Sequence, residues 1–204
     1  MLRGPDRPVF LVIAGPNGSG KSTAYEHERT NYALRGRTVW IVNPDLLSKL
    51  IREQESIDPV EANVAAVTRI EAWLDASLEV HKTIGVETVL STPKYRRLVA
   101  KAKRLGFLFW LIYVVLDTPA RNIERVAMRV AKGGHHVPED KILSRYARSL
   151  DQLAWFLEQA DSAWVYDNSG AEIRLIGQKE SGVLTLDVDA IPTIRDVAER
   201  IRTS

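Results

Sequence analysis

Cysteine is absent from the 204-residue sequence, and long apolar runs are scarce. Without cysteine, disulfide bonds and thiolate metal sites are excluded, which fits a reducing compartment. The longest apolar run, residues 107–116, has about half of the roughly 20 residues that a membrane-spanning helix needs. An earlier run, residues 9–14, leads into a glycine-rich segment instead of the small-residue cleavage site of a signal peptide. We therefore expect a cytoplasmic protein with no membrane partner.

Excess charge of one sign is also missing. The 28 Lys and Arg residues nearly balance the 26 Asp and Glu residues, and the net charge of +2 requires no nucleic-acid or membrane partner. The apolar and charged fractions, 45% and 26%, lie near the averages of globular proteins. Because neither an internal repeat nor a linker-like segment interrupts the chain, we predict a single domain over residues 1–204.

Short apolar runs alternate with amphipathic segments along the chain. The runs predict strands over residues 9–14, 38–42, 86–90, 107–116 and 163–166. The segments between and after them predict helices over residues 22–34, 44–52, 59–83, 93–104, 119–131 and 139–160. This alternation predicts an α/β fold with a mainly parallel sheet and helices on both faces. Residues 172–177 and 183–188 predict a hairpin, and residues 191–202 a closing helix.

One predicted helix, residues 59–83, has a regular apolar pattern. The spacing of three and four predicts that one buried stripe contains Val60, Val64, Val67, Ile70, Leu74 and Leu78.

The glycine-rich segment carries the most specific motif. Residues 15–22, Gly-Pro-Asn-Gly-Ser-Gly-Lys-Ser, match the P-loop pattern G-x-x-x-x-G-K-[ST] in full. Glycine lets the backbone bring its amide groups close to phosphates, and the following helix points its positive end at the same anion. Lys21 is expected to contact the β- and γ-phosphates and Ser22 to bind Mg²⁺. The predicted ATP ligands are Gly15, Pro16, Asn17, Gly18, Ser19, Gly20, Lys21, Ser22 and Thr23.

The motif alone leaves the reaction open, because GTPases, motor ATPases, transporters and kinases share it. Ligands of an open parallel sheet bind beyond the carboxyl ends of its strands, and Asp45 follows the second predicted strand. Asp45 can accept a proton from an attacking hydroxyl group, or it can cap the helix over residues 44–52.

A second carboxylate and three hydroxyl groups lie at the third predicted strand. Glu87 stands in an apolar strand, where a carboxylate must meet a ligand, a cation or an arginine. Contacts to the acceptor are predicted for Asp45, Glu87, Thr88, Ser91 and Thr92.

The segment after the fourth predicted strand resembles a hinged lid. Basic residues at positions 121, 125, 129 and 132 share one helical face, which is also typical of a solvated stripe. Two glycines at 133–134 and a proline at 138 interrupt it, so we predict a lid over residues 129–148. Arg129 and Arg145 are expected to neutralise charge on the transferred phosphoryl group, with Arg148 as the alternative to Arg145. His135 either donates to phosphate or caps the helix.

Four further segments, taken with the P-loop, carry a family resemblance. They are Asn-Pro-Asp at 43–45, residues 87–92, residues 125–135 with their Gly-Gly-His end, and Val137-Pro138 with Arg-Tyr-Ala-Arg-Ser-Leu at 145–150. Over residues 8–168 the chain resembles the zeta-toxin family of P-loop kinases, especially its compact members.

The resemblance implies an adenylate-kinase-like core that uses ATP and Mg²⁺. In the family the residue that matches Asp45 is the proposed base, and the one that matches Glu87 contacts the acceptor. Well-known members phosphorylate the 3′ hydroxyl of UDP-N-acetylglucosamine and have an antitoxin that blocks the ATP site. Larger substrate-facing insertions of those toxins have little room here, so another sugar nucleotide, a nucleoside or a different hydroxylated metabolite stays open as the acceptor.

Three functions therefore remain from the sequence. The first is a small-molecule kinase with Asp45 as base. The second is a polynucleotide kinase, for which residues 96–104 offer a basic helix. The third is a nucleotide-dependent switch that performs no phosphoryl transfer and needs no lid arginines.

Overall fold

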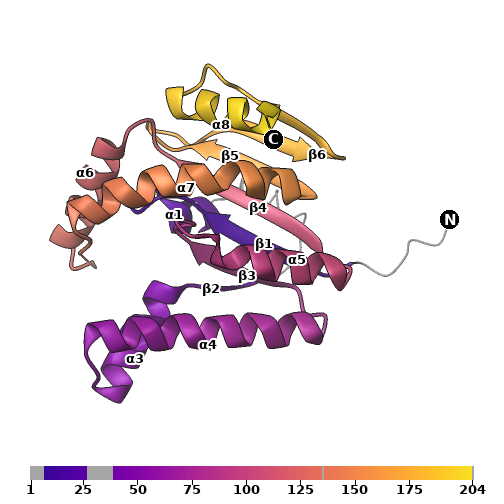
Figure 1. The fold of residues 1–204 in the computed structure, drawn as a ribbon. Coiled ribbons are helices and arrows are strands. Elements are labelled where there is room, and N and C mark those ends of the chain that lie inside the picture. The colour runs from indigo at the N-terminus through magenta and orange to yellow at the C-terminus, as the bar shows by residue number, and fades with distance from the viewer. Residues whose placement is uncertain (1–6, 27–38, 135, 204) are drawn as a thin grey trace.

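The computed structural model describes residues 7–26, 39–134 and 136–203 (Figure 1). Its strands are β1 (Val9–Ala14), β2 (Trp40–Val42), β3 (Ile84–Thr88), β4 (Leu108–Val115), β5 (Ser162–Asp167), β6 (Arg174–Glu180) and β7 (Val183–Leu186). Its helices are α1 (Lys21–Glu26), α3 (Pro44–Glu55), α4 (Pro59–Glu79), α5 (Arg96–Arg104), α6 (Pro119–Ala131), α7 (Glu139–Gln159) and α8 (Pro192–Thr203), with a 3-10 turn η1 (Pro93–Tyr95) before α5. Residues 27–34 of the first predicted helix lie outside the described residues.

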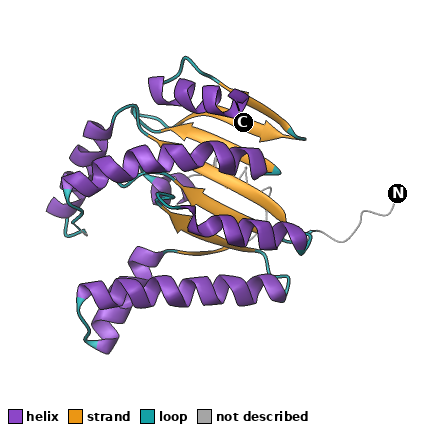
Figure 2. Ribbon diagram, in the orientation of Figure 1, coloured by secondary structure: helices purple, strands orange, loops and turns teal. Residues whose placement is uncertain are grey.

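All seven strands join one sheet in the order β2-β3-β1-β4-β5-β6-β7. The first five strands are parallel, and β6 and β7 add an antiparallel hairpin at one edge (Figure 2). The predicted α/β fold with its mainly parallel sheet is confirmed, as is the hairpin. Because parallel strands end on the same edge, the residues after β1, β2 and β3 lie close together.

Alternate residues of β1 face two apolar clusters. Phe10 and Val12 join the larger cluster, to which α4, α5, α7 and α8 all contribute buried side chains. Figure 1 shows α5 and α7 lying across this face of the sheet. Leu11 and Ile13 join the smaller cluster on the opposite face, where Ala24 of α1 packs. The strand is therefore buried on both sides, as its unbroken apolar run predicts.

The apolar stripe predicted for α4 is wrong in its first half. Val60 and Val64 are 71% and 63% exposed, whereas Ala62 and Ala66 are buried. These alanines pack with Ile51 of α3, so small side chains allow the two helices to approach closely. The partner helix, which a single-helix pattern does not reveal, decides which face is buried.

Helix α4 also ends earlier than predicted. The N–H of Lys82 donates to the carbonyl of Ser77, and that of His81 to Leu78. His81 has a φ of +54°, so it closes the helix in the left-handed position that glycine usually takes. The next strand starts at Ile84 in consequence, and β3 covers residues 84–88 instead of the predicted 86–90.

The basic helix α5 is held against α4 by ion pairs. Arg97 and Lys101 both contact the carboxylate of Asp75, at 2.7 Å each, and Lys101 also contacts Glu79 at 2.7 Å. Lys103 donates to the carbonyl of Gln159 at the end of α7. Three of the basic side chains that favoured a polynucleotide substrate therefore have partners within the fold.

These ion pairs predict acid sensitivity. Hydrogen bonds from Arg97 and Lys101 lower the pKa of Asp75 from 3.8 to about 2. A carboxyl group with a depressed pKa stabilises the fold above its unfolded pKa, and this contribution is lost as the pH falls from about 4 to about 2. Because the pair is partly exposed, we expect it to contribute about 1 kcal/mol to the free energy of unfolding. Urea unfolding should show that the free energy of unfolding falls less between pH 5 and pH 3 in Asp75→Asn than in the wild type. An equal fall in both proteins would contradict a stabilising role of the Asp75 ion pairs.

Among the described residues, no helix is long and apolar enough to cross a membrane.

Candidate functional site

The P-loop joins β1 to α1 and is shaped by three glycines. Gly15, Gly18 and Gly20 have φ values of +144°, +76° and +89°. A Cβ atom at Gly15 would overlap the carbonyl oxygen of Val114, and one at Gly18 would lie 2.7 Å from the Asn122 carbonyl oxygen. Only glycine fits these positions, and the resulting loop is the kind of backbone cradle that binds phosphate groups.

Lys21 lies at the centre of the candidate site. Its buried Nζ donates to the carbonyls of Gly15 and Pro16, at 2.9 and 3.1 Å. Burial lowers the pKa of Lys21, the negative charges of Glu87 and Asp45 act against that shift, and the positive charge of Arg129 adds to it. Charged side chains of α3, β3 and α6 thus lie within electrostatic reach of Lys21.

Glu87 contacts the hydroxyl group of Ser22. The Ser22 Oγ donates to both carboxylate oxygens, at 3.2 and 3.1 Å. Strand register explains the contact, because Glu87 is paired with Ile13, two residues before the P-loop begins. The sequence left open whether Glu87 meets a ligand or an arginine. Among the described residues its carboxylate contacts Ser22.

A hydroxyl and a carboxylate are oxygen ligands of the type that Mg²⁺ prefers, so Ser22 and Glu87 fit a magnesium ion. Within residues 7–26, 39–134 and 136–203, no group of three or more His, Asp or Glu could hold a metal ion. A magnesium ion at Ser22 and Glu87 would share its coordination with nucleotide phosphates, as is usual for Mg²⁺.

Asp45 lies in the first turn of α3 with an exposed side chain. The cap of this helix is Asn43, whose Oδ1 accepts from the N–H groups of Asp45 and Leu46, at 2.8 and 3.3 Å. The capping role that the sequence left open for Asp45 thus belongs to Asn43. The exposed Asp45 carboxylate acts to raise the pKa of Lys21, so the two side chains are within electrostatic reach of each other.

The remaining acceptor candidates lie along the end of β3. The Thr88 Oγ1 accepts from the N–H of Leu90, which has a φ of +60°. Ser91 is half-buried, whereas Thr92 is exposed and precedes η1 without capping it. Thr23 is exposed on α1, and His135 lies outside the described residues.

The basic row on α6 divides into separate roles. Arg121 forms two hydrogen bonds with Asp117, at 2.8 and 3.0 Å, and these lower the pKa of that carboxyl group. Arg125 donates to the carbonyl of Asn168 at 2.6 Å. Arg129, one turn further, is half-buried and acts on Lys21. The row is therefore not a plain solvated stripe, and Asp117 is anchored at the start of α6.

Helix α6 ends in a glycine turn that leads to α7. The N–H groups of Gly133 and Gly134 donate to the carbonyls of Val130 and Arg129, both at 2.9 Å, and Gly133 has a φ of +84°. A Cβ atom at Gly134 would lie 2.5 Å from the Cγ of Arg129, so the turn packs directly on that side chain. On α7, Arg145 is half-buried and Arg148 is exposed.

Two asparagines outside the motif contact the P-loop, and the sequence analysis missed both. The Nδ2 of Asn122 on α6 donates to the carbonyl of Asn17 at 2.6 Å. The Nδ2 of Asn168, which follows β5, donates to the carbonyl of Ser19 at 2.8 Å. Single asparagines carry no sequence pattern. The position of Asn168 after a parallel strand was the available signal.

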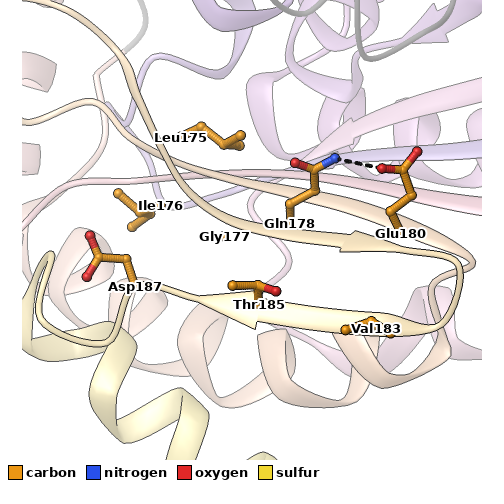
Figure 3. A pocket seen from close by; sticks show the side chains of 8 residues that line it. All are labelled: Leu175, Ile176, Gly177, Gln178, Glu180, Val183, Thr185 and Asp187. Atoms are coloured by element: carbon orange, nitrogen blue, oxygen red, sulfur yellow. Dashed lines mark hydrogen bonds between the residues drawn. The ribbon is translucent and has the colours of Figure 1, made fainter.

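Two hollows lie elsewhere on the molecule and contain none of the predicted site residues. One, of about 470 Å³, is lined by the β6–β7 hairpin from Leu175 to Asp187 (Figure 3). The other, of about 600 Å³, is lined by Trp40 of β2, by Trp73 and the end of α4, and by the residues that lead into β3. Trp40 and Trp73 stack on each other with centroids 6.3 Å apart.

Comparison with known proteins agrees with this architecture. The Zeta toxin family model matches residues 2–180. A relative, an uncharacterized protein of Haemophilus influenzae, is 26% identical over 136 residues, which are 67% of this chain and 91% of that protein.

Solved structures show the same fold. A chain of the AvrRxo1-ORF1:ORF2 complex with ATP superposes with a TM-score of 0.69 at 14% identity, covering 97% of this chain. The present chain spans only 64% of that one. A chain of the PezAT chromosomal toxin–antitoxin system of Streptococcus pneumoniae superposes with a TM-score of 0.62 at 15% identity, over 99% of this chain and 90% of its own. With a P-loop, a mainly parallel sheet and a family model that matches most of its length, the chain belongs to the Zeta toxin family.

Proposed function

We propose that this protein is an ATP-dependent kinase that transfers the γ-phosphate to a hydroxyl group of a small molecule. The observation that carries the proposal is the P-loop with its buried Lys21 and the Ser22–Glu87 contact, within electrostatic reach of the charges of Asp45 and Arg129. Nucleotide binding alone requires the phosphate cradle, whereas transfer to a hydroxyl group also requires a group that takes the proton, a role that an exposed carboxylate can fill. A kinase uses both.

In the proposed reaction, the P-loop amides and Lys21 bind the phosphates of ATP, and Ser22 with Glu87 holds Mg²⁺. The metal ion supplies positive charge that neutralises the phosphate oxygens. The acceptor oxygen bonds to the γ-phosphorus while the bond to the β–γ bridging oxygen breaks and ADP leaves. Asp45 takes the hydroxyl proton. Its carboxylate is suited to this role because it lies within electrostatic reach of Lys21 and because Asn43, not Asp45, caps α3.

The lid residues stabilise the charge on the transferred group. Arg129 is proposed to contact the phosphoryl oxygens from α6, and Arg145 from α7, with His135 as a further donor between the two helices. Positive charge at this point lowers the barrier because charge is spread over three oxygens in the transition state.

The acceptor is proposed to be a sugar nucleotide such as UDP-N-acetylglucosamine, bound near Asp45, Glu87, Thr88, Ser91 and Thr92. Membership of the Zeta toxin family supports this choice. A second protein is proposed as a partner in the cytoplasm, since solved relatives come from a toxin–antitoxin system and from a two-protein complex.

Labelled ATP tests the acceptor class. We would incubate the protein with Mg²⁺, γ-labelled ATP and UDP-sugars, nucleosides, nucleotides or short RNA, with Lys21→Ala as the inactive control. We expect label on a UDP-sugar that is lost in the control. Label on RNA or a nucleoside instead would contradict the proposed acceptor but would still support kinase activity.

A further inference from the structure

Two asparagine side chains from other parts of the fold donate hydrogen bonds to backbone carbonyls of the P-loop. Asn122 on α6 binds the carbonyl of Asn17, which lies 105 positions earlier, and Asn168 after β5 binds that of Ser19, 149 positions earlier. Asn122 is fully buried, and Asn168 is half-buried. Neither belongs to the P-loop pattern, and the reaction outlined above uses neither.

The two hydrogen bonds fix the direction of two peptide planes. In a trans peptide the carbonyl of one residue and the N–H of the next point in opposite directions. When the carbonyls of Asn17 and Ser19 point at the asparagine amides, the N–H groups of Gly18 and Gly20 point the other way. An anion that lies in the loop is bound by such N–H groups, so their orientation before binding decides how much order the loop must gain.

Gly18 and Gly20 lie close to the same two asparagines. A Cβ atom on Gly18 would lie 2.7 Å from the Asn122 carbonyl oxygen, and one on Gly20 would overlap the Asn168 Nδ2. The asparagines therefore contact the same glycines whose N–H groups they orient.

The hydrogen bonds from Asn122 and Asn168, which we call the asparagine clamp, also connect the P-loop to α6. The guanidinium of Arg125 donates to the Asn168 carbonyl at 2.6 Å, so the second asparagine is itself held by α6. Asn122 and Arg125 lie one turn apart on that helix, and Arg129 follows one turn later. Both contacts to the P-loop thus depend on the helix that carries the proposed catalytic arginine.

We propose that Asn122 and Asn168 are positioning residues that pre-orient the P-loop amides for the phosphates of ATP. The inference rests on the proposed function only in taking ATP as the ligand. It predicts that the asparagines contribute to binding of the phosphates and not to binding of the nucleoside.

The test compares ATP with adenosine. Asn122→Ala and Asn168→Ala each remove one donor without adding charge, and Asn168 is exposed enough for its variant to fold. Asn63→Ala, at an exposed position of α4 where the side chain accepts from Ser48, is the matched control. Calorimetric titration should show at least tenfold weaker binding of ATP to both clamp variants, unchanged binding of adenosine, and wild-type values for the control.

Unchanged affinity for ATP in both variants would overturn the inference, as would an equal loss for ATP and adenosine, which indicates general damage to the fold. The outcome is separable from the proposed reaction because it needs no transfer. If the wild type binds ATP but phosphorylates no acceptor, the proposed kinase is contradicted, and the ATP affinities of the two asparagine variants still decide the present inference.

Discussion

Arg129→Ala is expected to lower the rate of phosphoryl transfer by about 10³-fold, because arginines that neutralise transition-state charge contribute effects of that order. The guanidinium lies on α6 in the field of Lys21, and the glycine turn at 133–134 packs on its side chain. ATP binding should change far less than the rate, since this charge is needed most when the phosphoryl group is in transfer. Single-turnover kinetics with saturating ATP measures the effect.

Two variants make this prediction specific. Arg129→Lys keeps the charge but loses the planar set of donors, so we expect its rate of phosphoryl transfer to lie between those of the wild type and Arg129→Ala. Arg104→Ala, at the exposed end of α5, removes an arginine outside the site and should leave the rate unchanged. A wild-type rate in Arg129→Ala would remove the lid arginine from the mechanism and favour a nucleotide switch.

Asp45→Asn is expected to lower acceptor phosphorylation by about 10²- to 10⁴-fold, the range of general base catalysis. Asparagine keeps the size of the side chain but cannot take the hydroxyl proton. Because Asn43 caps α3, the substitution removes only the weak interaction of a first-turn carboxylate with the helix dipole, and the melting temperature should stay close to that of the wild type. ATP affinity should not fall, since the variant removes a negative charge near the phosphates.

The matched variant for Asp45 is Asn43→Ala, which removes the cap and keeps the carboxylate. We expect it to lower the free energy of unfolding by about 1 kcal/mol, with a smaller effect on the rate. Full activity of Asp45→Asn would exclude this carboxylate as the base. A drop in melting temperature that matches the drop in rate would assign it a structural role instead.

The sequence predicted those parts of the site that have a local pattern. The P-loop and the carboxyl ends of β1 and β2 follow from apolar runs and a motif, whereas β3 ends two residues before its predicted end. The parallel order of these strands then brings Asp45 and Glu87 to the same edge of the sheet as the loop. The Ser22–Glu87 contact needed the register of two strands, which no single run contains. Helix α6 was predicted with its observed bounds, because Thr118 caps its start and a glycine turn follows it.

The features that the sequence analysis predicted wrongly or did not predict all depend on contacts with residues distant in the sequence. Val60 and Val64 are exposed since α3 packs on the alanine side of α4. The asparagine contacts join residues more than 100 positions apart, and one amide group at each site leaves no periodic signal.

The most direct test of the account is the stoichiometry of ATP turnover, followed by ³¹P NMR with Mg²⁺ and an acceptor found in the labelled screen. A kinase should form ADP and a phosphomonoester of the acceptor in equal amounts, only when the acceptor is present, and Lys21→Ala should form neither. Acceptor-independent release of ADP and inorganic phosphate, with no phosphomonoester, would contradict the account and identify the site as a hydrolytic switch.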